Sequence, residues 1–348
     1  MRLVYYKPQI NANSKLAEYQ ENKESLHAIY LNLVDGERTA DDIAKMLLIN
    51  GHMIGDIITV MNELQKCGVI SEAPTSDLGI FDAQELDNLE NQLNALSMFN
   101  FDKNGMFMPY SPSSLSHQKR IKEAKIMVVG NGENARRLIT ELTRLGLGEI
   151  QYYIYGTENV VADEDSTIKA LDTVSHDYTD IYIHKTFNQE LDTDIISRGN
   201  TDIVVYIEDD FSEKTAVQIN DICRQNQKDF LPFQISFPKV YVGPFYIYKQ
   251  TACYKCYQIR KDAAKIPYTP ASPKAANAQL NIVFGVDLLC LEIVKYYSYI
   301  TDMTTVDNVW TFDIVTGKTS YQPVFKIPRC PICGVSKIKP TKKLWENI

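Results

Sequence analysis

The chain has 348 residues, which is enough for two to three domains of roughly 150 residues each. Hydrophobic residues make up 45% of it and charged residues 23%, an ordinary globular composition that excludes wholesale disorder. Lys and Arg total 36 against 44 Asp and Glu, a net charge of −8. This balance argues against a nucleic-acid partner, because such proteins usually carry a basic excess that neutralises phosphates.

No targeting or membrane segment is visible in the sequence. The residues after Met1 turn polar by Lys7, so no signal peptide is indicated. No stretch approaches the roughly 18 uncharged apolar residues that a membrane span needs. The seven cysteines are an odd number, which fits poorly with a secreted, fully disulfide-bonded chain. We therefore expect a cytoplasmic protein with no membrane partner.

Residues 1–75 are predicted to form a separate small domain. Leu26, Ile29, Tyr30 and Leu33 follow the spacing of one helix face, and Thr39 is a good N-cap for a second helix. The predicted elements are a strand at 3–6, a weaker strand at 16–20, helices from Leu26, after Thr39 and over 53–66, and a short strand at 69–71. Strands with three short helices and a wing are the outline of a winged helix-turn-helix.

The third helix of this domain has an apolar face and an acidic surface. Residues expected to face inward are Ile43, Met46 and Leu47 of the second helix and Ile54, Ile57, Ile58, Met61 and Leu64 of the third. Asp56 and Glu63 on the third helix would repel phosphate, so DNA binding is disfavoured. The groove beside this helix could instead receive an extended peptide by strand addition. The expected contacts are Leu16, Tyr19, Ile57, Ile58 and Met61, and a domain used only for packing stays open.

The rest of the chain is predicted to be a linker followed by an α/β domain. Residues 76–120 form the linker, with a helical stretch at 82–97, since 101–116 is rich in Pro, Ser, Gly and Asn. Over 121–348 strands and helices alternate, which indicates a Rossmann-like, mostly parallel sheet covered on both faces. The predicted strands are 126–129, 150–155, 181–183 and 203–207, the helices are 133–145, 213–225 and 281–297, and a hairpin spans 309–325.

Two cysteine pairs give the strongest chemical signal. Cys253 and Cys256 form one Cys-x-x-Cys knuckle, and Cys330 and Cys333 form another. Two such knuckles supply the four thiolates that Zn²⁺ favours, and four protein ligands leave no open position. We expect one structural zinc ion per chain, which staples the C-terminal part. A redox pair and buried free thiols are the alternatives. The redox pair is disfavoured because neither pair is expected to begin a helix after a strand.

A glycine-rich turn follows the first strand of the α/β domain. Gly130 and Gly132 allow a tight turn, and Ala135 allows close packing of the following helix. A working nucleotide site would also have an acidic residue at the end of the next strand, and Tyr155-Gly156 stands there instead. We therefore predict a vestigial nucleotide turn that serves the fold.

Several segments resemble one known family. Ser116–Ile121 through Gly146–Ile150 is similar to the beginning of ThiF-like folds, relatives of the ubiquitin-activating enzymes. The Ocin-ThiF-like partner proteins of YcaO cyclodehydratases resemble this chain in further motifs, which are Val242-Gly-Pro-Phe245, Arg260 after the first cysteine pair, Val309-Trp-Thr-Phe312, Thr316-Gly317 and Pro328–Gly334. Residues 31–44 resemble the PqqD-like recognition element that such proteins carry.

The resemblance implies a non-catalytic role in the biosynthesis of thiazole- or oxazole-modified peptide antibiotics, such as thiopeptides or bacteriocins. A subunit of this kind binds the leader of a ribosomal precursor peptide and presents it to the YcaO cyclodehydratase. The YcaO enzyme then uses ATP to form thiazolines or oxazolines. The implied partners are the leader peptide, the YcaO enzyme and a flavin dehydrogenase of the same complex, and the ThiF-like fold implies a homodimer by analogy.

The sequence differs from active ThiF-like adenylating enzymes at positions that they use to bind ATP. Active ThiF-like adenylating enzymes end the second strand in aspartate, whereas Ile154, Tyr155 and Gly156 stand here. Asp209 and Asp210 match an acidic position of the family only loosely. We therefore expect no ATP use and no catalysis by this chain alone. The alternatives are an active ATP-dependent peptide-adenylating ThiF homologue and a winged-helix transcription regulator.

Overall fold

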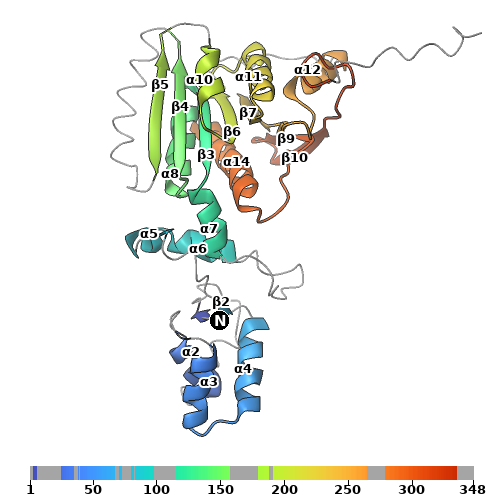
Figure 1. Ribbon diagram of the computed structural model, residues 1–348. Helices are drawn as coiled ribbons and strands as arrows, with labels where there is room; N and C mark the ends of the chain where they lie inside the picture. Colours follow the sequence, from blue (N-terminus) through green and yellow to red (C-terminus); the bar gives the residue numbers. More distant parts are fainter. Residues whose placement is uncertain are drawn as a thin grey trace, which may run out of the picture. The chain divides into compact units, whose positions relative to one another are not determined.

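The structure is a computed structural model (Figure 1). It describes residues 3–5, 25–34, 38, 40–66, 70–72, 80–81, 83–97, 114–156, 179–187, 191–264 and 279–334. The chain divides into two compact units. The first comprises residues 1–121 and 298–301, and the second comprises 122–297 and 302–348. No helix among the described residues is long and apolar enough to cross a membrane.

The first unit begins with three helices and a small sheet. The helices are α2 (Leu26–Leu33), α3 (Ala40–Ile49) and α4 (Ile54–Lys66). Strands β1 (Leu3–Tyr5) and β2 (Ile70–Glu72) pair antiparallel, with Leu3 opposite Glu72. Ser25 caps α2, since its Oγ accepts a hydrogen bond of 3.2 Å from the amide of Ala28. The three predicted helices and the strands at both ends of this segment are therefore present.

The rotation of α4 about its axis differs from the sequence prediction. Ile57, Val60 and Leu64 are buried at the spacing i, i+3, i+7, and they join Tyr30, Ile43 and Leu47 in one core. Ile54 and Ile58 are 50% and 47% exposed, and Met46 of α3 is 38% exposed. The prediction that these three side chains face inward is wrong, because Val60 takes the core position between Ile57 and Leu64. The predicted strand at 16–20 and the N-cap Thr39 lie outside the described residues.

Three further helices complete the described part of the first unit. They are α5 (Ala83–Asn88), α6 (Glu90–Ser97) and α7 (Ser114–Lys122). The helical stretch predicted at 82–97 is thus two short helices. Phe81, Leu89 and Leu115 form a small core between them. Helix α7 begins at Ser114, within a segment predicted to be loop.

The second unit is built on an eight-stranded sheet with the order β10-β9-β8-β7-β6-β3-β4-β5. Strands β7, β6, β3, β4 and β5 are parallel, and β8, β9 and β10 continue the sheet antiparallel. The strands are β3 (Lys125–Asn131), β4 (Glu149–Tyr155), β5 (Asp180–Thr186), β6 (Ile203–Glu208), β7 (Asp229–Ser236), β8 (Lys239–Val242), β9 (Asn308–Asp313) and β10 (Lys318–Pro323). The α/β class and the mostly parallel sheet are confirmed.

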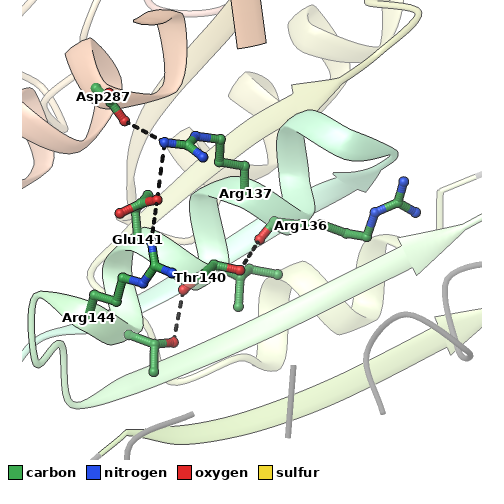
Figure 2. A network of polar contacts seen from close by, with 8 residues as sticks. Arg136, Arg137, Thr140, Glu141, Arg144 and Asp287 are labelled. Carbon is green, nitrogen blue, oxygen red and sulfur yellow. Dashed lines mark hydrogen bonds and ion pairs between the residues drawn. The ribbon is translucent and has the colours of Figure 1, made fainter. Parts of the chain in front are cut away.

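Helices pack on both faces of this sheet (Figure 1). One core joins the sheet to α10 (Thr193–Arg198), α11 (Glu213–Gln225) and α12 (Tyr254–Ala263). The other helices among the described residues of this unit are α8 (Glu133–Arg144) and α14 (Gln279–Ser298). Figure 2 shows that Arg137 of α8 reaches both Glu141, at 3.2 Å, and Asp287 of α14, at 3.5 Å. This ion-pair network ties α8 to α14.

Candidate functional site

Four cysteines meet at one end of the second unit. Cys253 is the N-cap of α12 and Cys256 lies in its first turn, while Cys330 and Cys333 follow β10. Their sulfurs all lie within 4.8 Å of one another. The Sγ of Cys253 is 3.8 Å from that of Cys256 and 3.5 Å from that of Cys330, and the Sγ atoms of Cys256 and Cys333 are 3.4 Å apart. The four predicted ligands thus come together.

The geometry of these sulfurs fits a metal ion such as zinc. A tetrahedron of thiolates with Zn–S bonds of about 2.3 Å has sulfurs about 3.8 Å apart, close to the separations found here. Cys253, Cys256 and Cys330 are buried, and the amide of Ile327 lies 3.4 Å from the Sγ of Cys256 as a hydrogen-bond donor. Such a donor stabilises a metal-bound thiolate. A bound zinc ion would hold α12 to the segment after β10.

Cys253 begins a helix, α12, and residues 243–252 separate it from the end of β8. The position of the first pair at a helix start therefore does not by itself exclude a redox pair. The convergence of all four sulfurs favours a metal site instead, because a dithiol pair needs only two. The other cysteines that the structure describes, Cys223 and Cys290, are buried in α11 and α14. Cys67 lies outside the described residues.

The glycine-rich turn joins β3 to α8. Gly130 and Gly132 have φ angles of 142° and 92°, which L-residues rarely adopt. A Cβ on Gly130 would collide with the carbonyl oxygen of Ile207, and one on Gly132 would collide with the carboxyl group of Asp209. Ala135 is fully buried. These small residues allow the turn to lie against the end of β6.

The carboxylate of Asp209 occupies the amino terminus of α8. It accepts hydrogen bonds of 3.1 Å from the amides of Glu133 and Asn134, and one of 2.7 Å from the Asn134 side chain. A helix amino terminus with free amides is where a nucleotide phosphate binds in Rossmann-like folds. Here an anion of the chain itself satisfies those amides. The sequence analysis matched Asp209 only loosely to an acidic position of the family and did not predict this contact, because Asp209 lies 76 residues from Glu133.

Tyrosines and a buried carboxyl group fill the neighbouring strand ends. Glu208 ends β6 and accepts a hydrogen bond of 2.6 Å from the hydroxyl of Tyr206, and Tyr155 at the end of β4 also bonds to it. Burial raises the pKa of Glu208 above its usual value. Burial and the nearby Glu208 raise the pKa values of Tyr155 and Tyr206 as well. In dinucleotide-binding Rossmann folds an acidic residue near the end of the second strand binds the ribose. Here the buried Tyr155 ends that strand instead.

The predicted peptide contacts of α4 lie at different depths. Ile57 is 2% exposed and belongs to the core. Met61 is partly buried against that core, and Ile58 is exposed together with Ile54. Leu16 and Tyr19 lie outside the described residues. Further large apolar residues are exposed in α3 and just before α4, namely Met46, Leu48, Ile49 and Met53. The sequence prediction missed this apolar surface, because it placed Ile54 and Met46 in the core.

Solved structures share the fold of this chain at low sequence identity. E. coli MccB with MccA-N7isoAsn is 14% identical with a TM-score of 0.60, and the match covers 96% of this chain and 100% of MccB. E. coli MccB with ATP is 14% identical with a TM-score of 0.59, covering 96% and 97%. PaaA is 12% identical with a TM-score of 0.56, covering 84% and 98%. These likenesses show that the chain shares its overall fold with MccB and PaaA. No protein-family model and no curated protein sequence matches the chain.

Removing one cysteine ligand tests the metal site. Cys330→Ser should lower the zinc content well below the roughly one ion per chain expected of the purified wild-type protein, because three thiolates hold Zn²⁺ less tightly than four. The melting temperature should fall as well. Elemental analysis and thermal unfolding measure the two effects. Cys290→Ser is the matched control, since it removes a buried thiol outside the cluster and should leave the zinc content unchanged. Equal zinc content in wild type and Cys330→Ser would contradict the site.

The role of Asp209 can be tested by its removal. Asp209→Ala should lower the free energy of unfolding by about 1–3 kcal/mol, because buried helix-terminal amides lose their acceptor. Urea denaturation followed by circular dichroism measures the change. Asp210→Ala is the control, since Asp210 is the exposed neighbour and should change stability by less than about 0.5 kcal/mol. Equal effects of the two substitutions would show that the contact does not stabilise α8.

Proposed function

We propose that this protein is a non-catalytic, peptide-binding subunit of a complex that forms thiazolines or oxazolines in a ribosomal precursor peptide. A YcaO cyclodehydratase is the proposed catalytic partner. The observation that carries the proposal is the carboxylate of Asp209 on the amino terminus of α8. A phosphate there would meet a fixed negative charge, so the fold is present without the anion site that nucleotide chemistry needs.

The comparison with MccB supports a role in the biosynthesis of a peptide antibiotic. MccB is described as a microcin C7 biosynthetic enzyme, and one of its structures is a complex with N-formylated MccA. Its fold spans 96% of the present chain. A fold used in one peptide-antibiotic pathway is a reasonable basis for proposing a role in another. The resemblance of residues 31–44 to PqqD-like elements supports leader recognition by the first unit.

The surface of α4 supports peptide binding in that unit. Ile54 and Ile58 are one helical turn apart, half-exposed, and follow the same side of α4 as the partly buried Met61. Exposed apolar stripes of this kind usually mark binding surfaces. We propose that the leader lies against this stripe as an added strand of a winged-helix domain. Apolar leader side chains would then bury Ile54 and Ile58.

Tethering explains how such a subunit assists catalysis. When the leader is held, the core of the precursor peptide stays at a high effective concentration beside the YcaO active site. The YcaO enzyme phosphorylates the amide oxygen after attack by Cys, Ser or Thr, and this chain supplies no reacting group. A homodimer, a flavin dehydrogenase in the same complex and a cytoplasmic location are further parts of the proposal.

An adenylating enzyme is the second candidate. Its support is the structure of MccB with ATP, in which the same fold accompanies a nucleotide. Two features of this chain oppose it: Tyr155 at the end of β4, and the Asp209 carboxylate beside the glycine turn. We therefore place ATP use in the YcaO partner.

The leader-binding proposal predicts a specific loss on α4. Ile58→Asp should weaken binding of a fluorescently labelled leader peptide by about tenfold or more, equivalent to about 1.4 kcal/mol, because it places a charge in the apolar contact. The leader is the one encoded beside this protein, and fluorescence anisotropy with the full chain measures the affinity. Thr59→Asp adds the same charge at the next exposed position and should have little effect. Failure of the wild-type chain to bind the leader would remove the proposal.

A further inference from the structure

Positive charge is concentrated near the C-terminus of this acidic chain. Residues 318–348 contain seven Lys and Arg and a single acidic residue, Glu346, whereas the whole chain has a net charge of −8. The described part of this stretch comprises β10 and residues 324–334, which include Cys330 and Cys333. A basic stretch in an acidic chain is typical of a surface that meets an anionic partner.

Three segments bring exposed cations together beyond the end of β10. Arg260 lies in the last turn of α12, Lys249 lies in a turn before this helix, and Lys326 and Arg329 follow β10. The Nε of Arg260 donates to the backbone oxygen of Phe325 at 3.1 Å. The Nζ of Lys326 donates to the backbone oxygen of Lys249 at 3.2 Å. These four exposed side chains, of Lys249, Arg260, Lys326 and Arg329, form the basic patch.

The charges of the basic patch are not neutralised by neighbouring acids. Among the described residues, no carboxylate forms an ion pair with any of its four side chains. Asp262 follows Arg260 by two residues and lies about 200° round α12 from it. Asp307 contacts the amide of Val324 through its backbone oxygen, and its carboxylate accepts a hydrogen bond of 3.1 Å from the amide of Ala252. The patch therefore offers its positive charge to another molecule.

An exposed aromatic ring adds an apolar contact to the basic patch. Phe325 is 64% exposed, and the guanidinium carbon of Arg260 lies 5.5 Å from the centre of its ring. This cation–π contact and the hydrogen bond to Phe325 help to fix the orientation of the guanidinium. Its two terminal nitrogens have no hydrogen-bond partner among the described residues. They are suited to a bidentate pair with a carboxylate.

The backbone under the basic patch is anchored at the cysteine cluster. Ile327, the residue after Lys326, donates its amide to the Sγ of Cys256 at 3.4 Å. The amide of Cys330, the residue after Arg329, donates to the backbone oxygen of Ile327 at 3.0 Å. Arg260 lies one helical turn after Cys256 on α12. A surface held in this way loses little conformational entropy when a partner binds.

A short acidic peptide fits the basic patch better than a long polyanion does. At physiological salt, exposed charges interact over about 8 Å, so a peptide of a few residues would meet the patch alone. Duplex DNA or an anionic membrane would also face the acidic remainder of the chain, which repels it. We propose that the basic patch binds an acidic peptide segment, in which carboxylates pair with the cations and an apolar side chain packs on Phe325.

Fluorescence anisotropy with the purified full chain tests this proposal. The probe is the peptide Glu-Asp-Leu-Glu-Asp-Leu, labelled with tetramethylrhodamine and amidated at its C-terminus. The control peptide, Gln-Asn-Leu-Gln-Asn-Leu, carries the same label and replaces each carboxylate by its amide. We expect the acidic peptide to bind at least about tenfold more tightly than the control at about 50 mM salt, and its affinity to fall as salt is raised. Equal binding of the two peptides, or no saturable binding of either, would overturn the proposal.

Charge reversal locates the binding on the basic patch. Lys326→Glu should weaken binding of the acidic peptide by about fivefold or more, because a repulsive charge replaces an attractive one. Lys249→Gln, which only removes a charge, should weaken it by about twofold. Lys239→Glu is the matched control, since the exposed Lys239 begins β8 opposite Asp313, at the far end of the strands from the patch. Equal affinities of Lys326→Glu and Lys239→Glu would overturn the proposal.

Competition separates a peptide from other anions. Single-stranded oligothymidine and vesicles that contain phosphatidylserine are titrated against the bound acidic peptide, at matched concentrations of negative charge. Little displacement is expected, and displacement by either at a lower concentration than by unlabelled acidic peptide would overturn the proposal in favour of a phosphate ligand. Binding to the basic patch does not depend on the leader-binding proposal, which is measured with a different ligand and different variants.

Discussion

The contact between Asp209 and the amino terminus of α8 links the main parts of the second unit. It joins the end of β6 to the turn between β3 and α8 through two backbone amides. Gly132 allows this contact, because a side chain there would collide with the carboxylate. The same contact places a negative charge where a nucleotide phosphate would bind in related folds. The proposed function rests on this carboxylate, because it accepts the hydrogen bonds of the first amides of α8.

The cysteine cluster near the C-terminus and the helices of the first unit are the two other features that matter for the proposed function. Near the C-terminus, four converging sulfurs bring together α12 and the segment after β10, both of which also pack on the core of the sheet. In the first unit, three helices bury Tyr30, Ile43 and Leu47 and leave Ile54 and Ile58 at the surface. The first arrangement is suited to a rigid scaffold. The second is suited to contact with another molecule.

The sequence predicted features that depend on local pattern. The spacing of Cys253, Cys256, Cys330 and Cys333 was enough for the cluster, and alternating apolar strands and helices were enough for the sheet. Strands β7 and β8 were not predicted; β7 contains Pro232, and proline is unusual in an interior strand. The rotation of α4 was misjudged, because consecutive isoleucines at 57 and 58 fit two phases equally well. Contacts such as Asp209 with α8 depend on tertiary structure, so spacing along the chain cannot reveal them.

The central claim is that this chain recognises a peptide and does no chemistry on it. The most direct test is ATP–pyrophosphate exchange by the purified full chain, with the precursor peptide encoded beside it and without a YcaO partner. The account predicts exchange no faster than in the absence of protein, because the Asp209 carboxylate and Tyr155 stand where nucleotide-binding groups would be needed. Robust peptide-dependent exchange would contradict it and would establish an adenylating enzyme.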